Sequence, residues 1–62
     1  MNLELKAEII RKYGSQANFA MAVKADETVI SRVIHGRKVL KAEDRKKWAK
    51  ALGTQPESLF KD

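Results

Sequence analysis

Cysteine is absent from the chain, and its 62 residues include one histidine, one proline and three glycines. Without cysteine there are no disulfides and no thiolate metal ligands, and the lone His35 leaves few other ligands for a metal. We therefore expect no metal and no cofactor. A chain of this length has room for one hydrophobic core, so we predict a single domain over residues 1–62, stabilised by packing alone.

Long apolar runs are also missing. No segment approaches the roughly 20 apolar residues that cross a bilayer. The sequence begins Met-Asn-Leu-Glu-Leu-Lys, which lacks the apolar core and the small-residue cleavage pattern of a signal peptide. We expect a soluble, cytoplasmic protein with no membrane partner. His35 is accompanied by no thiol, no serine–base dyad and no second histidine, so we expect neither an enzyme nor a small-molecule substrate.

Positive charge is plentiful, and it is concentrated in one region. The formal net charge is +5, but residues 1–31 are neutral, residues 32–50 carry +6 and residues 51–62 carry −1. A regional excess of this kind is typical of a face that binds a polyanion. A merely solvated surface is the alternative, since it can give the same count of charges.

Helix-start and helix-stop signals divide the chain into five short helices, at about 3–13, 16–23, 27–35, 42–52 and 56–60. Gly14 and Gly53 stand where a left-handed residue ends a helix. Ser15 and Asp26 stand at N-cap positions, and Pro56 suits the first turn of the last helix. No segment alternates with period two, so we predict an all-α bundle without strands.

The apolar positions of these helices recur at helical spacing, and they predict the core. Trp48, Phe19 and Tyr13 fall on these stripes, which favours burial over a role as stacking platforms for bases. The core expected from the helices up to residue 52 consists of Leu5, Ile9, Ile10, Tyr13, Phe19, Ala20, Val23, Ile30, Val33, Ile34, Trp48, Ala49 and Leu52. Leu59 and Phe60 either complete this core or form a dimer contact.

The joint between the second and third helices is only Lys24-Ala25-Asp26. A joint this short makes two helices cross steeply, which requires a small residue on the first helix and branched apolar residues on the second. Ala20, Ile30 and Val33 meet that requirement. The pattern predicts a helix-turn-helix from about Gln16 to His35. It leaves one flank of the third helix exposed, consisting of Glu27, Thr28, Ser31 and Arg32 with Val29 at its edge.

At these residues the chain resembles the phage repressor and Cro-like helix-turn-helix family. The resemblance is carried by Ser15-Gln16-Ala17, Phe19-Ala20, Val23, Ile30-x-x-Val33, His35-Gly36-Arg37, Trp48-x-x-Ala51-Leu52-Gly53 and Pro56-Glu57-x-Leu59-Phe60. It covers nearly the whole chain after Ser15. The family usually has glycine in the turn where this chain has Lys24, a difference that costs roughly 1 kcal/mol in a left-handed conformation.

The resemblance implies a transcriptional regulator that binds double-stranded DNA as a homodimer, with the third helix in the major groove of a palindromic operator. The residues that it places against base edges are Glu27, Thr28, Val29, Ser31 and Arg32. The residues that it places against phosphates are Gln16, Lys24, His35, Arg37, Lys38 and Lys41. The simpler explanation for three other lysines is that they form the solvated outer face of the fourth helix; they are Lys46, Lys47 and Lys50.

Each candidate also has an ordinary structural explanation. Arg32 can bind guanine with two hydrogen bonds, or it can pair with Asp26 or Glu27 within the protein. Glu27 can accept a hydrogen bond from cytosine, or it can simply stabilise the positive end of the helix dipole. Thr28 can contact DNA or stabilise the first turn of its helix.

Two other functions compete with DNA binding. The same fold serves as a protein-interaction module, such as an antitoxin-like partner, and an exposed apolar patch around Leu59 and Phe60 would favour that function. A basic helix lying on an anionic membrane would need bulky apolar residues facing outward, and the fourth helix has too few.

Overall fold

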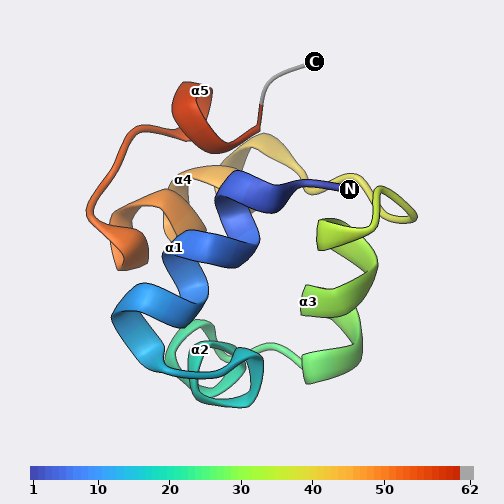
Figure 1. Cartoon of the computed structure of the whole chain (residues 1–62). Helices are drawn as coiled ribbons and strands as arrows, with labels where there is room; N and C mark the ends of the chain where they lie inside the picture. Colours follow the sequence, from blue (N-terminus) through green and yellow to red (C-terminus); the bar gives the residue numbers. More distant parts are fainter. Residues whose placement is uncertain (61–62) are drawn as a thin grey trace.

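Five helices make up the fold in the computed structural model, which describes residues 1–60 (Figure 1). They are α1 (Leu3–Tyr13), α2 (Gln16–Val23), α3 (Glu27–Ile34), α4 (Ala42–Leu52) and α5 (Pro56–Leu59). No strand occurs within the described range, so the predicted all-α bundle is confirmed. The last two residues of the predicted domain, 61 and 62, lie outside the described residues.

The local signals in the sequence determine most of these boundaries. Gly14 and Gly53 both have positive φ and follow the last residues of α1 and α4. The hydroxyl of Ser15 accepts a hydrogen bond from the Asn18 N–H at 3.1 Å, which caps α2. Pro56 lies in the first turn of α5, where its missing N–H removes no helical hydrogen bond.

Three local predictions need correction. The third helix ends at Ile34, and His35 and Phe60 are C-cap residues rather than members of their helices. Asp26 occupies the N-cap of α3 in an extended conformation, but its carboxylate makes no capping hydrogen bond. The amides of Val29 and Ile30 are bonded instead to the main-chain carbonyl of Asp26, at 3.0 and 3.2 Å.

The core gathers one face of every helix. It consists of Leu5, Ile9, Phe19, Ala20, Val23, Ile30, Val33, Ile34, Leu40, Trp48, Ala49, Leu52 and Leu59, all buried. The ring of Phe19 is edge-on to the rings of Tyr13 and Trp48, with 5.2 Å and 5.3 Å between the ring centres. Aromatic rings prefer this arrangement. These aromatics are therefore packing residues, as predicted, and Tyr13 also donates a hydrogen bond to the Ala51 carbonyl at 2.9 Å.

Two apolar residues differ from prediction. Ile10 was expected in the core, but α1 turns Leu5 and Ile9 inward and leaves Ile10 44% exposed. Leu40 lies in the basic connection after α3 and is buried, so this connection is anchored to the core by one apolar side chain.

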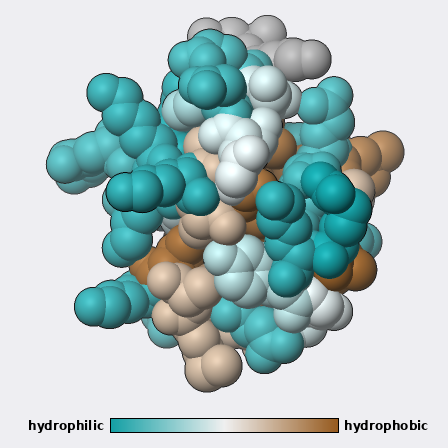
Figure 2. Space-filling model, turned by 90° about the vertical axis from the view of Figure 1, so that its left-hand side faces the viewer, coloured by the Kyte–Doolittle hydropathy of each residue, from teal (hydrophilic) through white to brown (hydrophobic). Residues whose placement is uncertain are grey.

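Asn2 connects the start of α1 to the end of α3. Asn2 caps α1 by accepting the Leu5 N–H at 3.0 Å. Its own N–H donates to the Ile34 carbonyl at the end of α3 at 2.6 Å. In Figure 1 the first residues accordingly lie beside the connection between α3 and α4. The face away from α3 presents hydrophilic side chains around smaller apolar areas (Figure 2).

Candidate nucleic-acid interface

The joint between α2 and α3 has the predicted length of three residues. Lys24 adopts the left-handed conformation, with φ 57° and ψ 48°, and is the one non-glycine residue within the described range with positive φ. The Ala25 N–H then bonds to the Ala20 carbonyl at 2.9 Å, which closes the end of α2. The backbone therefore makes the turn that glycine favours, at a cost of about 1 kcal/mol for lysine.

The turn buries one side of α3 and exposes the other. Ile30, Val33 and Ile34 are buried, and Ile30 and Ile34 are fully so. Of the five predicted base-contacting residues, Glu27, Thr28 and Arg32 are exposed, while Val29 and Ser31 are half-buried. Val29 packs against the core, so it offers only part of its side chain to a ligand.

The Arg32 side chain makes no ion pair or hydrogen bond with any other residue in the range 1–60. The internal salt bridge to Asp26 or Glu27 that could have explained this arginine is therefore not formed. An ion pair does join Arg11 to Glu8 on α1, with 2.6 Å between Nη2 and Oε1. A guanidinium with five donors and no acceptor nearby is available for a ligand that presents acceptors.

The candidate phosphate contacts precede and follow α3 along the chain. Gln16 is half-buried at the first residue of α2, and Lys24 is exposed in the joint. Past α3, four exposed residues follow in the order His35, Arg37, Lys38 and Lys41. Lys41 is also the N-cap residue of α4, so its backbone is tied to the start of that helix.

The His35 ring is held against the end of its own helix. Its Nδ1 lies 2.8 Å from the Ser31 carbonyl oxygen and 3.5 Å from the Ser31 hydroxyl. Since a carbonyl only accepts, Nδ1 carries the proton in this contact. The imidazole therefore has a fixed orientation at the end of α3, with its other nitrogen left to an external partner or to water.

Two further residues beyond α3 were not singled out from the sequence. Arg45 on α4 is half-buried, and its guanidinium carbon lies 6.0 Å from the centre of the Phe60 ring. Val39 stands between the exposed Lys38 and the buried Leu40 and is itself 76% exposed. An apolar residue inside a basic stretch was the available signal for Val39, whereas nothing local distinguished Arg45 from its lysine neighbours.

Comparison of the chain with models of protein families, with curated proteins and with solved structures gave no match. No helix in residues 1–60 combines the length and the apolar character needed to cross a membrane. The same residues contain no group of three acidic or histidine side chains that could hold a metal ion.

Proposed function

We propose that this chain is a sequence-specific regulator of transcription that binds double-stranded DNA and reads the major groove with α3. The observation that carries the proposal is the three-residue joint with Lys24 in a left-handed conformation, which accompanies an α3 flank of exposed Glu27, Thr28 and Arg32. An α-helix fits the major groove, and polar side chains on its exposed flank can reach base edges.

Charge supports the same proposal. The connection after α3 contributes the exposed cations Arg37, Lys38 and Lys41, and the neighbouring α4 starts directly after them. Cations beside a reading helix neutralise phosphates and orient the helix on the duplex, without themselves distinguishing sequences. Bound to an operator, such a protein acts by occupancy, as a repressor of the phage type does, and it needs no chemistry.

Selection from a randomised duplex at two salt concentrations tests this function. We expect one enriched sequence, bound at least about 1,000-fold more tightly than a scrambled duplex at physiological salt. The logarithm of the binding constant should fall linearly with the logarithm of salt concentration, by about 0.9 for each phosphate neutralised. Equal affinity for selected and scrambled duplexes would refute sequence-specific binding.

A protein-interaction module is the second candidate, and one observation favours it. Met1, Leu3 and Val39 are each more than 60% exposed and line a common groove. Apolar side chains gathered in this way mark interaction sites on other proteins. If the duplex selection yields no sequence and binding at low salt is negligible, this module becomes the better description.

A further inference from the structure

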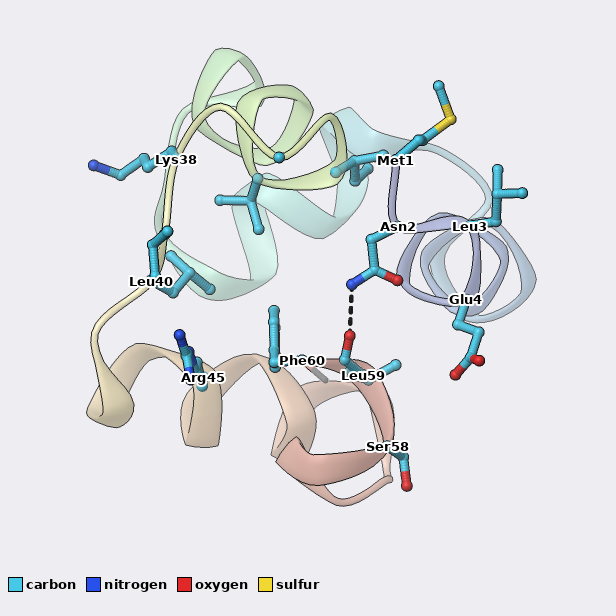
Figure 3. Close-up of a pocket in the computed structure, with 14 residues that line it drawn as sticks. Met1, Asn2, Leu3, Glu4, Lys38, Leu40, Arg45, Ser58, Leu59 and Phe60 are labelled. Atoms are coloured by element: carbon cyan, nitrogen blue, oxygen red, sulfur yellow. Dashed lines mark hydrogen bonds between the residues drawn. The ribbon is translucent and has the colours of Figure 1, made fainter. Parts of the chain in front are cut away.

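A groove of about 550 Å³ lies between the first residues of the chain, the connection from α3 to α4, and α5 (Figure 3). Its apolar lining comes from segments far apart in the sequence and includes Val33 and Ile34 of α3, Leu40 of the connection, Leu59 and Phe60. Sites for small organic ligands have volumes of about 300–1,000 Å³ and a mostly apolar lining, with a few polar groups that orient the ligand. The groove therefore has the size and the lining of such a site.

One polar group of the lining has no partner. Arg45 on α4 makes no hydrogen bond or ion pair with any other residue in the range 1–60. Its Nε atom is buried from water and is likewise unpaired in the described part of the chain. A guanidinium has only donors, and a buried donor without an acceptor costs free energy. A ligand that brings an acceptor into the groove would remove that cost.

The surroundings of Arg45 indicate the chemistry of the acceptor. Its guanidinium carbon lies 6.0 Å from the centre of the Phe60 ring, and in Figure 3 the side chain points toward Leu40. Lys38 is on the same side of the groove, whereas Glu4 is at the opposite edge. An anion is therefore attracted to the Arg45 end of the groove. A carboxylate matches a guanidinium best, because the two planar groups can share two parallel hydrogen bonds.

We propose that the groove binds a small organic acid with an apolar tail. The carboxylate pairs with Arg45, and the tail lies along Leu40, Leu59 and Phe60. The head supplies the acceptor that Arg45 lacks, and the tail removes apolar surface from water. This binding site goes beyond the proposed function and does not depend on it, because the ligand binds without DNA.

The edges of the groove fit a ligand with a tail. Residues 1–60 leave five large apolar side chains exposed, and three of them line this groove, namely Met1, Leu3 and Val39. A tail between these edges would reduce their contact with water. The unbranched side chain of Met1 has three rotatable bonds and can follow the shape of the ligand.

Titration with octanoate, below the concentration at which it forms micelles, tests the site. Trp48 is the single tryptophan of the chain, and its ring centre lies 6.3 Å from that of Phe60, so its fluorescence should report binding. We expect a Kd of about 0.1–1 mM, since a ligand this small has few atoms to bury in an open groove. Each methylene added to or removed from the tail should change the affinity about two- to fourfold.

Ligands that carry only one of the two features provide the controls. Acetate has the carboxylate without the tail and should not bind in this range. Octan-1-ol has the tail without the charge and should bind at least about tenfold more weakly than octanoate, because a hydrogen bond to a charged group is the stronger kind. Octylamine has the opposite charge and should bind more weakly still.

Variants of the chain separate the contribution of the head from that of the tail. Arg45→Gln should weaken octanoate binding at least about tenfold and leave octan-1-ol binding unchanged. Arg45→Lys keeps the charge without the planar fork and should lose less. Val39→Asn, at an exposed position, should weaken octanoate and octan-1-ol alike. Lys47→Gln, exposed on α4 outside the groove, is the matched control and should change neither.

Amide resonances locate the bound ligand and complete the test. Those of Val39 and Phe60 should shift with octanoate, whereas that of Met21, outside the groove, should not. The proposal is overturned if octan-1-ol binds as tightly as octanoate, if Arg45→Gln has no effect, or if the shifts lie away from the groove.

A protein partner is the competing occupant of the groove. A short acidic peptide rich in leucine that binds more tightly than octanoate, and loses affinity with Arg45→Gln, would overturn the small-ligand site and assign the groove to another protein. None of these measurements contains DNA, so their outcome is independent of the duplex selection that tests the proposed function.

Discussion

The side chain of Asn2 donates a hydrogen bond to the main-chain carbonyl of Leu59, with 2.5 Å between Nδ2 and O, although 57 positions separate the two residues. The oxygen of the same amide caps α1, and the Asn2 N–H bonds to the Ile34 carbonyl. One residue thus joins the start of α1 to the ends of α3 and α5. These three hydrogen bonds hold residue 2 against α1, α3 and α5 in a bundle that has no disulfides.

Substitution of Asn2 should separate what its side chain contributes to the free energy of unfolding by capping α1 from what it contributes by bonding to Leu59. Asn2→Ser keeps an N-cap acceptor but is too short to reach Leu59, and should cost about 1 kcal/mol, since it leaves a partly buried carbonyl unpaired. Asn2→Ala loses the cap as well and should cost about 2 kcal/mol. Urea unfolding followed by Trp48 fluorescence measures both. If the serine variant is as stable as the original chain, the long-range bond contributes nothing.

The helix boundaries could be predicted because their causes are local. Ser15 caps α2 through an amide three residues away, and Gly14 and Gly53 end their helices through their own φ angles. The single error of interior assignment, Ile10, arose because Ile9 and Ile10 are adjacent. Adjacent apolar residues on a helix are both buried in some places, as Val33 and Ile34 are on α3, so only the packing of α1 against the other helices decides that Ile9 is buried and Ile10 is exposed.

What the sequence did not reveal depends on distant residues. The bond from Asn2 to Leu59 and the burial of Leu40 require knowledge of which segments meet in space. The candidate interface was more predictable, since a period of 3.6 residues separates the buried Ile30 and Val33 from the exposed Thr28 and Arg32. The groove beside α5 could not be predicted, because its lining comes from four separate segments.

Lys24 should be a site where stability and DNA binding respond in opposite directions. Lys24→Gly removes the strain of a left-handed lysine and should raise the free energy of unfolding by up to about 1 kcal/mol. The same change removes a proposed phosphate contact, so affinity for every duplex should fall and the salt dependence should weaken by about one ion. Urea unfolding and salt-dependent gel shifts give the two measurements.

Lys24→Ala provides the control for that comparison, because alanine keeps the strained conformation but has no charge. It should bind DNA as weakly as the glycine variant without the gain in stability. Equal stability of the two variants would mean that the left-handed turn carries no measurable strain.

Phe19 should be the most sensitive core position, since its ring contacts both Tyr13 and Trp48. Phe19→Ala removes a fully buried ring and should cost about 3–5 kcal/mol. A 62-residue domain has a total stability of about 3–9 kcal/mol, so this loss removes a third of it or more and should lower the midpoint of thermal unfolding strongly. Circular dichroism tests this. Met21→Ala, at an exposed position, should change stability by less than about 0.5 kcal/mol.

Arg32 and Arg37 should differ in the kind of binding they support. Arg32→Ala should relax the preference at one base position, because two hydrogen bonds to guanine are worth about 1–3 kcal/mol against other bases. Arg37→Ala should weaken binding to all duplexes alike and reduce the salt slope by about one, as expected for loss of a phosphate contact. Both side chains are exposed, so neither change should alter folding.

Repeating the duplex selection with each variant distinguishes the two effects, and Lys47→Ala on the outer face of α4 serves as the control. If both arginine variants bind selected DNA at low salt as tightly as the original chain, the reading surface lies elsewhere on the molecule.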